Sequence, residues 1–426
     1  MRKSETIDKV APPAANQNPS DRIQPFRSFQ SPIYRLFFAS LLGQMAAMNM
    51  QMLARTLLIY RLTGSAAILG AVSIAFAVPM LLLSLFGGVV ADRFQKKTVM
   101  LIGNLVLIFV SLSVGLTLSF GYLSADVPGS WWILVVNSVF QGAVMALVMP
   151  ARQAIVPEIV GTEQIMNATS LNTMGMNAMR LFAPAAAGFL IDGVGFDAVF
   201  YTMSVLYVIS AVLVVLLPQT GTMPSKKNGA LSDIKEGLAY LKTEKTLLFI
   251  LVFAIAGVVL AMPYQQLLSI FADDVLMVGA TGLGVMMSVS GVGAVLGSIY
   301  IASLPNKRRG FLMLASGLFL GVSLTAFSLS SIWYLSLFLI ALVGLAQAAG
   351  LTLTSTLIQY YVDDAYRGRV MSILMMEFGL MSFGAFAAGM LTEVIGVQFA
   401  VASFGAVLTV IAFLALVSFP HIRALD

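Results

Sequence analysis

The chain contains twelve apolar runs, each long enough to cross a lipid bilayer as a helix. A transmembrane helix needs about 20 predominantly apolar residues, because it rises about 1.5 Å per residue through a hydrocarbon core of about 30 Å. The predicted spans are residues 34–60, 66–90, 99–120, 131–150, 166–191, 197–217, 246–272, 280–304, 310–329, 332–357, 369–395 and 398–418. Helices satisfy their own backbone hydrogen bonds inside lipid, so these runs predict an all-α polytopic membrane protein.

The composition excludes several classes of function. Charged residues make up 10% of the chain, against about 25% in an ordinary soluble protein. The net charge of +5 indicates no nucleic-acid partner, because the basic residues lie in loops between apolar runs. With no cysteine and one histidine, His421, the chain offers no disulfide, no catalytic triad, and neither a thiolate nor a histidine metal cluster. It has no Walker-type nucleotide loop, so we expect a protein that is not an enzyme and needs no cofactor.

The distribution of basic residues predicts how the chain crosses the membrane. With the N-terminus placed inside, all but three of the 24 lysines and arginines fall in or beside inner segments. The outer loops hold one basic residue, Arg61, and Arg55 and Arg180 lie within spans. Lysine and arginine are enriched on the cytoplasmic side of membrane proteins, so we expect both termini in the cytoplasm. The acidic residues expected in outer segments are Asp126, Asp192, Asp197, Asp273, Asp274 and Glu393.

The longest polar connection, at about 218–245, divides the spans into two groups of six. We therefore expect one bundle over 34–217 and a second over 246–418, joined by a cytoplasmic linker. Within the linker, residues 231–241 have helical apolar spacing, which predicts a helix on the membrane surface. We expect residues 1–33 to be a disordered cytoplasmic tail and residues 419–426 to be a second tail.

The connection between the second and third spans carries a glycine and a charge cluster at fixed spacing. Glycine permits close approach of another backbone, and the carboxylate of Asp92 suits the positive end of a neighbouring helix. The pattern resembles the signature loop of the major facilitator superfamily, with Gln95 where that family usually has glycine. The resemblance implies the twelve-helix major facilitator fold, with two pseudo-repeated six-helix bundles. It assigns a gating role to Gly88, Asp92, Arg93, Lys96 and Lys97.

Three further stretches are similar to the drug and siderophore exporters of that superfamily, of the macrolide-efflux and enterobactin-exporter type. They are the loop 150–158 after span four, residues 177–188 in span five, and residues 366–371 before span eleven. Many drug–proton antiporters have an arginine three residues before a Gln-Gly pair in span four, where this chain has Ser138. The role given to that arginine therefore does not carry over. The additional gating residues that the resemblance implies are Arg152, Glu158, Arg367, Gly368 and Arg369.

Polar and ionisable side chains inside spans are the candidates for a substrate pathway, because burying them in lipid is costly. Arg55 shares a helical face with Gln44, Met48 and Gln51; it either lines a cavity or extends to water near the outer end of span one. Arg180 is a pathway candidate too, although the resemblance of residues 177–188 favours a structural or gating role for it. The neutral groups either line the path or join neighbouring helices. These neutral candidates are Asn137, Gln141, Asn177, Tyr264, Gln265 and Gln347.

Glu377 is the one carboxylate that the sequence places well inside a span. A desolvated carboxylate holds its proton more tightly and is a candidate proton carrier. The alternatives are a permanent ion pair with an arginine and a position near the cytoplasmic end.

These observations together predict a monomeric secondary transporter that exports an amphipathic or hydrophobic small molecule across the lipid bilayer, in exchange for protons. Two alternatives remain open at this stage. One is a lysophospholipid transporter on the same fold, and the other is a membrane interaction protein that does not transport.

Overall fold

A computed structural model describes residues 26–219, 230–305, 307–363 and 366–426 of the chain. Within its helices, it describes the backbone but not the side chains of Leu85, Gly88, Val89, Ala91, Asp92, Thr162, 230–235, Leu238, Arg367, Gly368, Ser372, Met375 and Phe378. The described part is helical, and eleven of its helical segments are long and apolar enough to cross a membrane. A twelfth apolar helix, Gly379–Ile395, is shorter.

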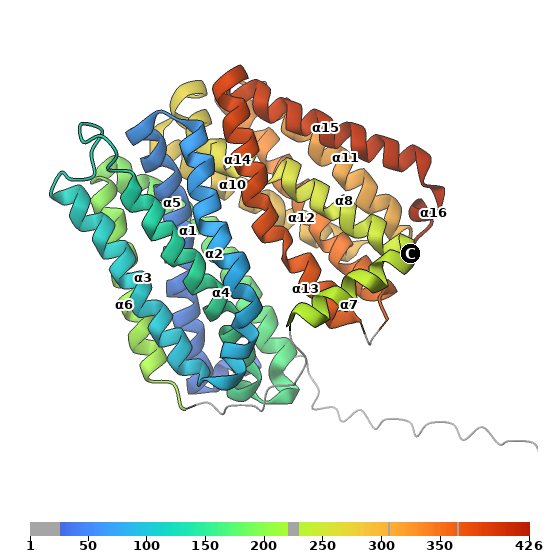
Figure 1. The fold of residues 1–426 in the computed structure, drawn as a ribbon, viewed down its shortest axis with the longest axis horizontal. Coiled ribbons are helices and arrows are strands. Elements are labelled where there is room, and N and C mark those ends of the chain that lie inside the picture. Colours follow the sequence, from blue (N-terminus) through green and yellow to red (C-terminus); the bar gives the residue numbers. More distant parts are fainter. Residues whose placement is uncertain (1–25, 220–229, 306, 364–365) are drawn as a thin grey trace, which may run out of the picture.

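Six long helices form the first bundle, on the left of Figure 1. They are α1 (Pro32–Thr63), α2 (Ala66–Arg93), α3 (Lys96–Ser119), α4 (Trp132–Val160), α5 (Ile165–Gly193) and α6 (Phe196–Val215). The sequence marks the ends of α1 clearly. Ser31 caps its N-terminus by accepting a hydrogen bond from the backbone N–H of Tyr34, Pro32 occupies the first turn, and Gly64 ends it in the left-handed conformation at φ 62°.

The second bundle, on the right of Figure 1, repeats the arrangement with two interrupted spans. Its helices are α8 (Lys245–Ala261), α9 (Tyr264–Ile270) with a π-helical turn η3 (Phe271–Val275), α10 (Gly279–Ser303), α11 (Arg309–Ser328), α12 (Trp333–Tyr361), α13 (Arg367–Met375), α14 (Glu377–Ile395) and α15 (Val397–Ser418). Pro263 separates α8 from α9, because proline has no N–H to donate within a helix. A short helix, α16 (Pro420–Arg423), ends the chain.

Close packing between corresponding helix pairs supports the internal repeat. In the first bundle a side chain at Gly142 of α4 would collide with the carbonyl of Phe76 on α2. In the second bundle, Gly344 of α12 lies in the same way against the carbonyl of Ser290 on α10. Small residues allow membrane helices to approach this closely, which compensates for the weak hydrophobic driving force in lipid. The predicted all-α architecture of two related six-helix bundles is confirmed.

Two local predictions are wrong. Disorder was expected through residue 33, but Arg27–Gln30 form a 3₁₀ turn, η1, and α1 begins at Pro32. The turn is held by a hydrogen bond from the Ser28 N–H to Asn167 Oδ1, at 3.0 Å, and by packing of the Phe29 ring against Tyr34. The region 150–158 was expected to be a loop, but α4 continues through Pro150 and Pro157 to Val160.

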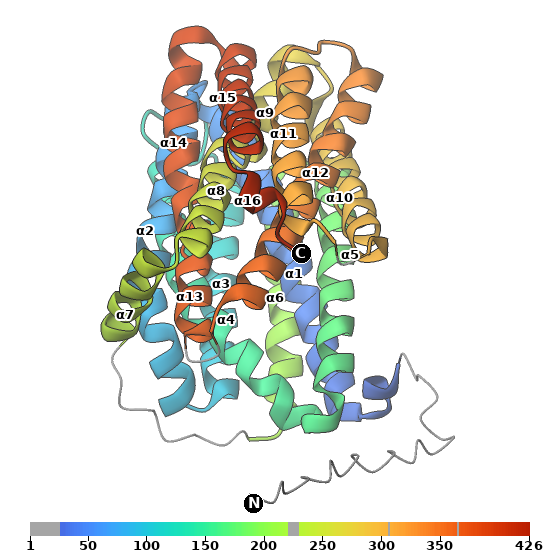
Figure 2. The ribbon, with the colours of Figure 1, turned by 90° about the vertical axis from the view of Figure 1, so that its right-hand side faces the viewer.

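The predicted helix in the linker is confirmed as α7 (Ala230–Thr243), which lies beside α13 (Figure 2). The rings of Tyr240 and Tyr366 stack with centroids 4.2 Å apart, and Arg369 forms a salt bridge of 2.9 Å with Glu236. These contacts tie α7 to the second bundle.

Candidate functional site

The two bundles contact each other strongly at one end, which we call the clamp end. Arg61 of α1 donates two hydrogen bonds to the carboxylate of Asp273, at 2.8 and 3.0 Å. The hydroxyl of Tyr60 donates to the neighbouring carboxylate, that of Asp274. Arg61 also lies over the ring of Phe196, 5.6 Å from its centroid. A forked guanidinium–carboxylate contact fixes orientation as well as distance, so it aligns the two bundles at this end.

Two more carboxylates at the clamp end cap helices of the opposite bundle. Asp192, at the end of α5, accepts a hydrogen bond of 2.7 Å from the backbone N–H of Thr281 in the first turn of α10. Glu393, near the end of α14, accepts 3.1 Å and 2.7 Å hydrogen bonds from the N–H of Ala67 and the hydroxyl of Ser65 at the start of α2. The first N–H groups of a helix have no partner within the helix and carry partial positive charge, so a carboxylate stabilises them.

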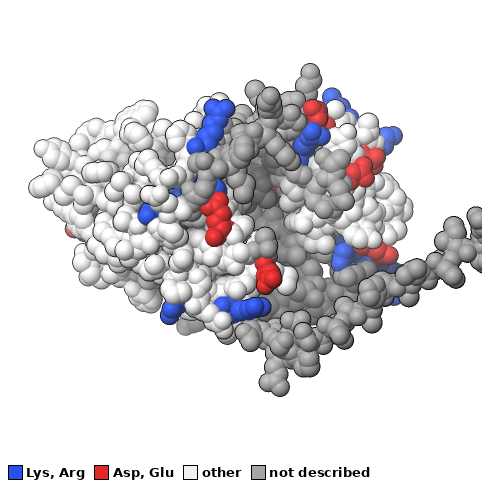
Figure 3. All heavy atoms as spheres, turned by 90° about the horizontal axis from the view of Figure 1, so that it is seen from below, with Lys and Arg blue, Asp and Glu red and all other residues white. Residues whose placement is uncertain are grey.

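The opposite end, which we call the open end, carries the basic motif. Figure 3 views this end, where basic and acidic side chains lie at the surface of both white lobes. In Figure 1 the ribbons of the two bundles lie further apart at this end than at the clamp end. Lys96 is buried in a 2.6 Å salt bridge with Glu158 of α4. Lys97 donates to the carbonyls of Val215 and Leu217, at 2.7 and 2.6 Å, at the C-terminus of α6. Lys96 and Lys97 therefore brace α3 against α4 and α6.

The other predicted gating residues are described to different extents. Arg93 is exposed at the end of α2. Arg152 is 6% exposed, and its Nε and Nη2 atoms have no hydrogen-bond partner among the described residues. Arg369 contacts Glu236 and lies over the ring of Tyr366. The side chains of Asp92 and Arg367, and the surroundings of Gly88 and Gly368, lie outside the described part.

A pocket of about 360 Å³ lies between the bundles, and we call it the interface pocket. It brings together three predicted pathway residues, Arg180 of α5 with Tyr264 and Gln265 of α9. The hydroxyl groups of Tyr264 and Ser290 lie 3.1 Å apart and are hydrogen-bonded. Asn49 of α1 also lines the pocket, although the sequence did not predict it as a pathway residue. Its position beside Met48 in a polar, methionine-rich stretch was the available signal.

Arg55 belongs to a polar network inside the first bundle. It donates to Oε1 of Gln141 at 3.1 Å, and Nε2 of Gln141 donates to Oε1 of Gln51 at 2.9 Å. The hydroxyl of Tyr207 on α6 donates to the same Gln51 oxygen at 3.4 Å. The guanidinium lies over the ring of Phe76, 5.6 Å from its centroid. Side chains from four helices thus meet at one cation, and no carboxylate among the described residues forms a salt bridge with it.

The remaining predicted pathway residues are dispersed. Asn137 exchanges hydrogen bonds with Ser113 of α3, which is the helix-joining arrangement. Gln44 is 1% exposed, and its Oε1 has no partner among the described residues. Met48 is half-buried and Asn177 is exposed. Gln347 of α12 accepts a hydrogen bond of 3.5 Å from Gln265, so it is linked to the interface pocket.

Glu377 begins α14, directly after the interruption that follows α13. The side chain is 5% exposed, and Oε2 has no hydrogen-bond partner among the described residues. A buried charge normally needs a partner, and none is described for Oε2 of this carboxyl group.

Two six-helix bundles, joined at one end and enclosing polar side chains at their interface, define a membrane transporter of the major facilitator fold. Residues 23–426 match the family model described as transmembrane secretion effector, and the chain belongs to this family of major facilitator transporters. The family consists of transporters and not enzymes.

The curated relatives include exporters. The chain is 30% identical to an uncharacterised MFS-type transporter, YfiS, of Bacillus subtilis, over 85% of this chain and 87% of the relative. It is 24% identical to the staphyloferrin A transporter of Staphylococcus aureus, over 78% and 83% of the two chains. It is also 24% identical to macrolide efflux protein A of Streptococcus pyogenes, over 82% and 89%. The expected similarity to drug and siderophore exporters is confirmed.

Solved structures show the same fold. The nucleoside transporter NupG superposes with a TM-score of 0.70 at 13% identity, covering 91% of this chain and 99% of that one. A bacterial homologue of the lysosomal transporter Spinster gives a TM-score of 0.63 at 15% identity, over 94% and 96%.

Proposed function

We propose that this protein exports small amphipathic molecules from the cytoplasm by alternating access, in exchange for protons. The names of two relatives, a siderophore transporter and a macrolide efflux protein, support the substrate class. Within this proposal the protein is a monomer of the bacterial inner membrane, with both termini in the cytoplasm. Its bundles span 34–217 and 246–418, and the linker 218–245 joins them.

One observation carries the proposal: the bundles are clamped at one end, and their helices diverge toward the other. In the orientation that the basic residues predict, the clamp faces outward and the open end faces the cytoplasm. This is the conformation in which an exporter loads its substrate. The interface pocket, with Arg180 and Gln265, lies between the two bundles. During transport the bundles would open at one end and close at the other in alternation. Release to the outside requires the Arg61–Asp273 clamp and both carboxylate caps to open.

Glu377 is proposed as the proton carrier. It is buried at a helix interruption, and its orphaned Oε2 supports a carboxyl group that gains and loses a proton as its surroundings change. A substrate or conformation that brings a cation near Glu377 would favour proton release, and the reverse step would favour uptake. Substrate and proton would thereby be exchanged.

The test is transport in proteoliposomes. A ligand panel of siderophores, drugs and lysophospholipids is first screened by thermal shift, and the best binders are then assayed. We expect accumulation driven by an imposed pH gradient and abolished by a protonophore. Accumulation that does not depend on the pH gradient would contradict the proposed exchange for protons. Transport of lysophospholipids alone would favour the lipid transporter, and no transport of any binder would favour an interaction protein.

A further inference from the structure

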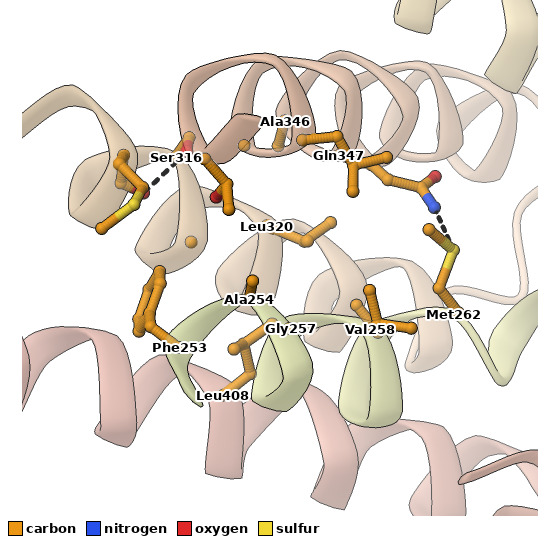
Figure 4. Close-up of a pocket in the computed structure, with 16 residues that line it drawn as sticks. Phe253, Ala254, Gly257, Val258, Met262, Ser316, Leu320, Ala346, Gln347 and Leu408 are labelled. Carbon is orange, nitrogen blue, oxygen red and sulfur yellow. Dashed lines mark hydrogen bonds between the residues drawn. The ribbon is translucent and has the colours of Figure 1, made fainter. Parts of the chain in front are cut away.

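A second cavity lies inside the second bundle, between α8, α11, α12 and α15 (Figure 4). The empty space between its lining residues, including the part that is open to solvent, is about 490 Å³. Its walls are apolar or small: Ala254 and Gly257 of α8, Leu320 of α11, Ala346 of α12 and Leu408 of α15. We call it the bundle cavity.

The polar side chains that line the bundle cavity are those of Ser316, Gln347 and Thr354, and the hydroxyl of Ser316 donates to the carbonyl of Met313. Gln347 donates to the sulfur of Met262 and accepts a hydrogen bond of 3.5 Å from Gln265. Gln265 itself lines the interface pocket. The two glutamines therefore stand between the two spaces, so that one ligand could place a polar part in the interface pocket and an apolar part in the bundle cavity.

The interface pocket supplies a cation without a counter-charge. Arg180 is exposed and lines this pocket, and none of the described residues forms a hydrogen bond or a salt bridge with its side chain. Among the described lining residues there is no carboxylate, and the other polar groups are Asn49, Tyr264, Gln265 and Ser290. A guanidinium in this setting selects a carboxylate, sulfate or phosphate, which it can bind with two parallel hydrogen bonds.

We propose that the transported substrate is an anionic amphiphile, with its charged head at Arg180 and a single alkyl chain in the bundle cavity. This inference rests on the proposed export function and specifies the substrate chemistry. The ligand would pass between the interface pocket and the bundle cavity beside Gln265 and Gln347. A chain held in an apolar cavity contributes roughly fourfold in affinity for each methylene group that it buries, until the cavity is filled.

Binding is tested without transport, using a single cysteine in a chain that has none. Ser316 lines the bundle cavity, and Ser316→Cys is a nearly isosteric change there. The protein is reconstituted in nanodiscs of zwitterionic lipid, and the rate of N-ethylmaleimide labelling is measured with alkyl sulfates from butyl to decyl. We expect protection to strengthen about fourfold per methylene and then to level off. Alkyltrimethylammonium ions of the same lengths should protect at least tenfold more weakly.

Substitutions assign the two ends of the ligand. A Cβ atom at Gly257 would meet nothing within 4 Å, so Gly257→Leu fills the cavity without a backbone clash, and Gly257→Ala is the matched control. In the Ser316→Cys background, Gly257→Leu should abolish the dependence on chain length, and Gly257→Ala should retain it. Arg180→Gln should remove the preference for sulfate over ammonium, and Arg180→Lys should restore it.

The outcomes separate this inference from the proposed function. Protection independent of chain length, or equal for both head groups, would overturn the inference even where pH-driven export is intact. Labelling that is blocked in nanodiscs without any probe, but proceeds in delipidated detergent, would assign the cavity to a bilayer lipid and overturn the substrate assignment. If the alkyl sulfates protect the introduced cysteine as expected but the protein transports none of its ligands, export is refuted and the binding site is retained.

Discussion

Arg55 of α1 donates hydrogen bonds to two side chains of α4, Gln141 at 3.1 Å and Ser138 at 3.4 Å. Ser138 occupies the position at which many related drug–proton antiporters have an arginine. Arg55 of α1 therefore brings a guanidinium to the α4 position at which the resemblance would have placed one.

Moving this guanidinium back to α4 is expected to preserve function. Arg55→Ser should lower the rate of substrate export by roughly ten- to a hundredfold, because a hydrogen bond to a charged group contributes about 1.5–3 kcal/mol. The double variant Arg55→Ser with Ser138→Arg should recover a substantial part of the rate. Export assays in proteoliposomes, with thermal unfolding to confirm folding, provide the measurement. If the double variant is no better than Arg55→Ser, the location of the charge is not what matters.

Weakening the clamp should shift the protein toward the conformation that is open at the clamp end. Arg61 and Asp273 are partly exposed, and such pairs contribute about 0.2–1 kcal/mol, so Arg61→Ala should change the population ratio by about fivefold at most. Spin labels on cysteines at Tyr122 and Val394, one exposed position in each bundle, report the separation. The charge reversal Arg61→Asp with Asp273→Arg is the control and should restore the original distance distribution. An unchanged distribution in Arg61→Ala would show that the caps alone hold this end closed.

Asp92→Asn should impair transport with little loss of folded protein. We expect Asp92 to hold the end of α2 against the start of α13 near Gly368 when the protein faces outward. Losing that contact would change the balance of the two states. Export rate and thermal stability are compared with those of Asp126→Asn, which alters an exposed loop carboxylate. Wild-type rates in Asp92→Asn would rule out the gating role.

Glu377→Gln should bind ligand but fail to accumulate it in response to a pH gradient. Glutamine keeps the size and hydrogen-bonding capacity of the protonated carboxyl group and cannot release a proton. The readout is the ratio of pH-driven accumulation to passive counterflow in proteoliposomes, with at least a tenfold fall expected. Full accumulation in this variant would transfer the coupling role to Asp192 or to a carboxylate on the substrate.

The orientation can be tested because the chain has no native cysteine. Single cysteines at Ser225 and Asn306 should resist membrane-impermeant thiol reagents in intact cells, and one at Ser124 should react. Labelling after permeabilisation controls for burial of the introduced thiol. The reverse pattern would invert the topology and, with it, the assignment of the open end to the cytoplasm.

The sequence predicted the helices well because span length and loop charge are local properties. It did not predict that α4 passes through Pro150 to Val160, since proline normally ends a helix. Nor did it predict the interruption between α13 and α14 at Met376, where no proline or glycine marks the break. Both features depend on packing against neighbouring helices, which supply the contacts that the local sequence does not encode.

The partners of polar groups were the least predictable part of the site. Arg55, Gln51 and Gln141 were chosen separately for their polarity, but their hydrogen-bonded network joins residues of α1 and α4 that are far apart in the chain. The direction of each side chain decided the rest, because a change of one position rotates a residue by about 100° around a helix. Asn49 lines the interface pocket for this reason, whereas Gln51 faces the interior of the first bundle.

The docking of α7 on α13 has a mechanical consequence for the connection between the bundles. Tyr240 and Glu236 fasten α7 to the second bundle, and Lys97 holds the carbonyl of Leu217 at the end of α6. The connection between the two anchored ends therefore shortens to residues 218–229, which can span roughly 40 Å when fully extended. Two polypeptides divided within these residues should assemble in one membrane as a working pair, because the contacts that fasten each end lie outside the division.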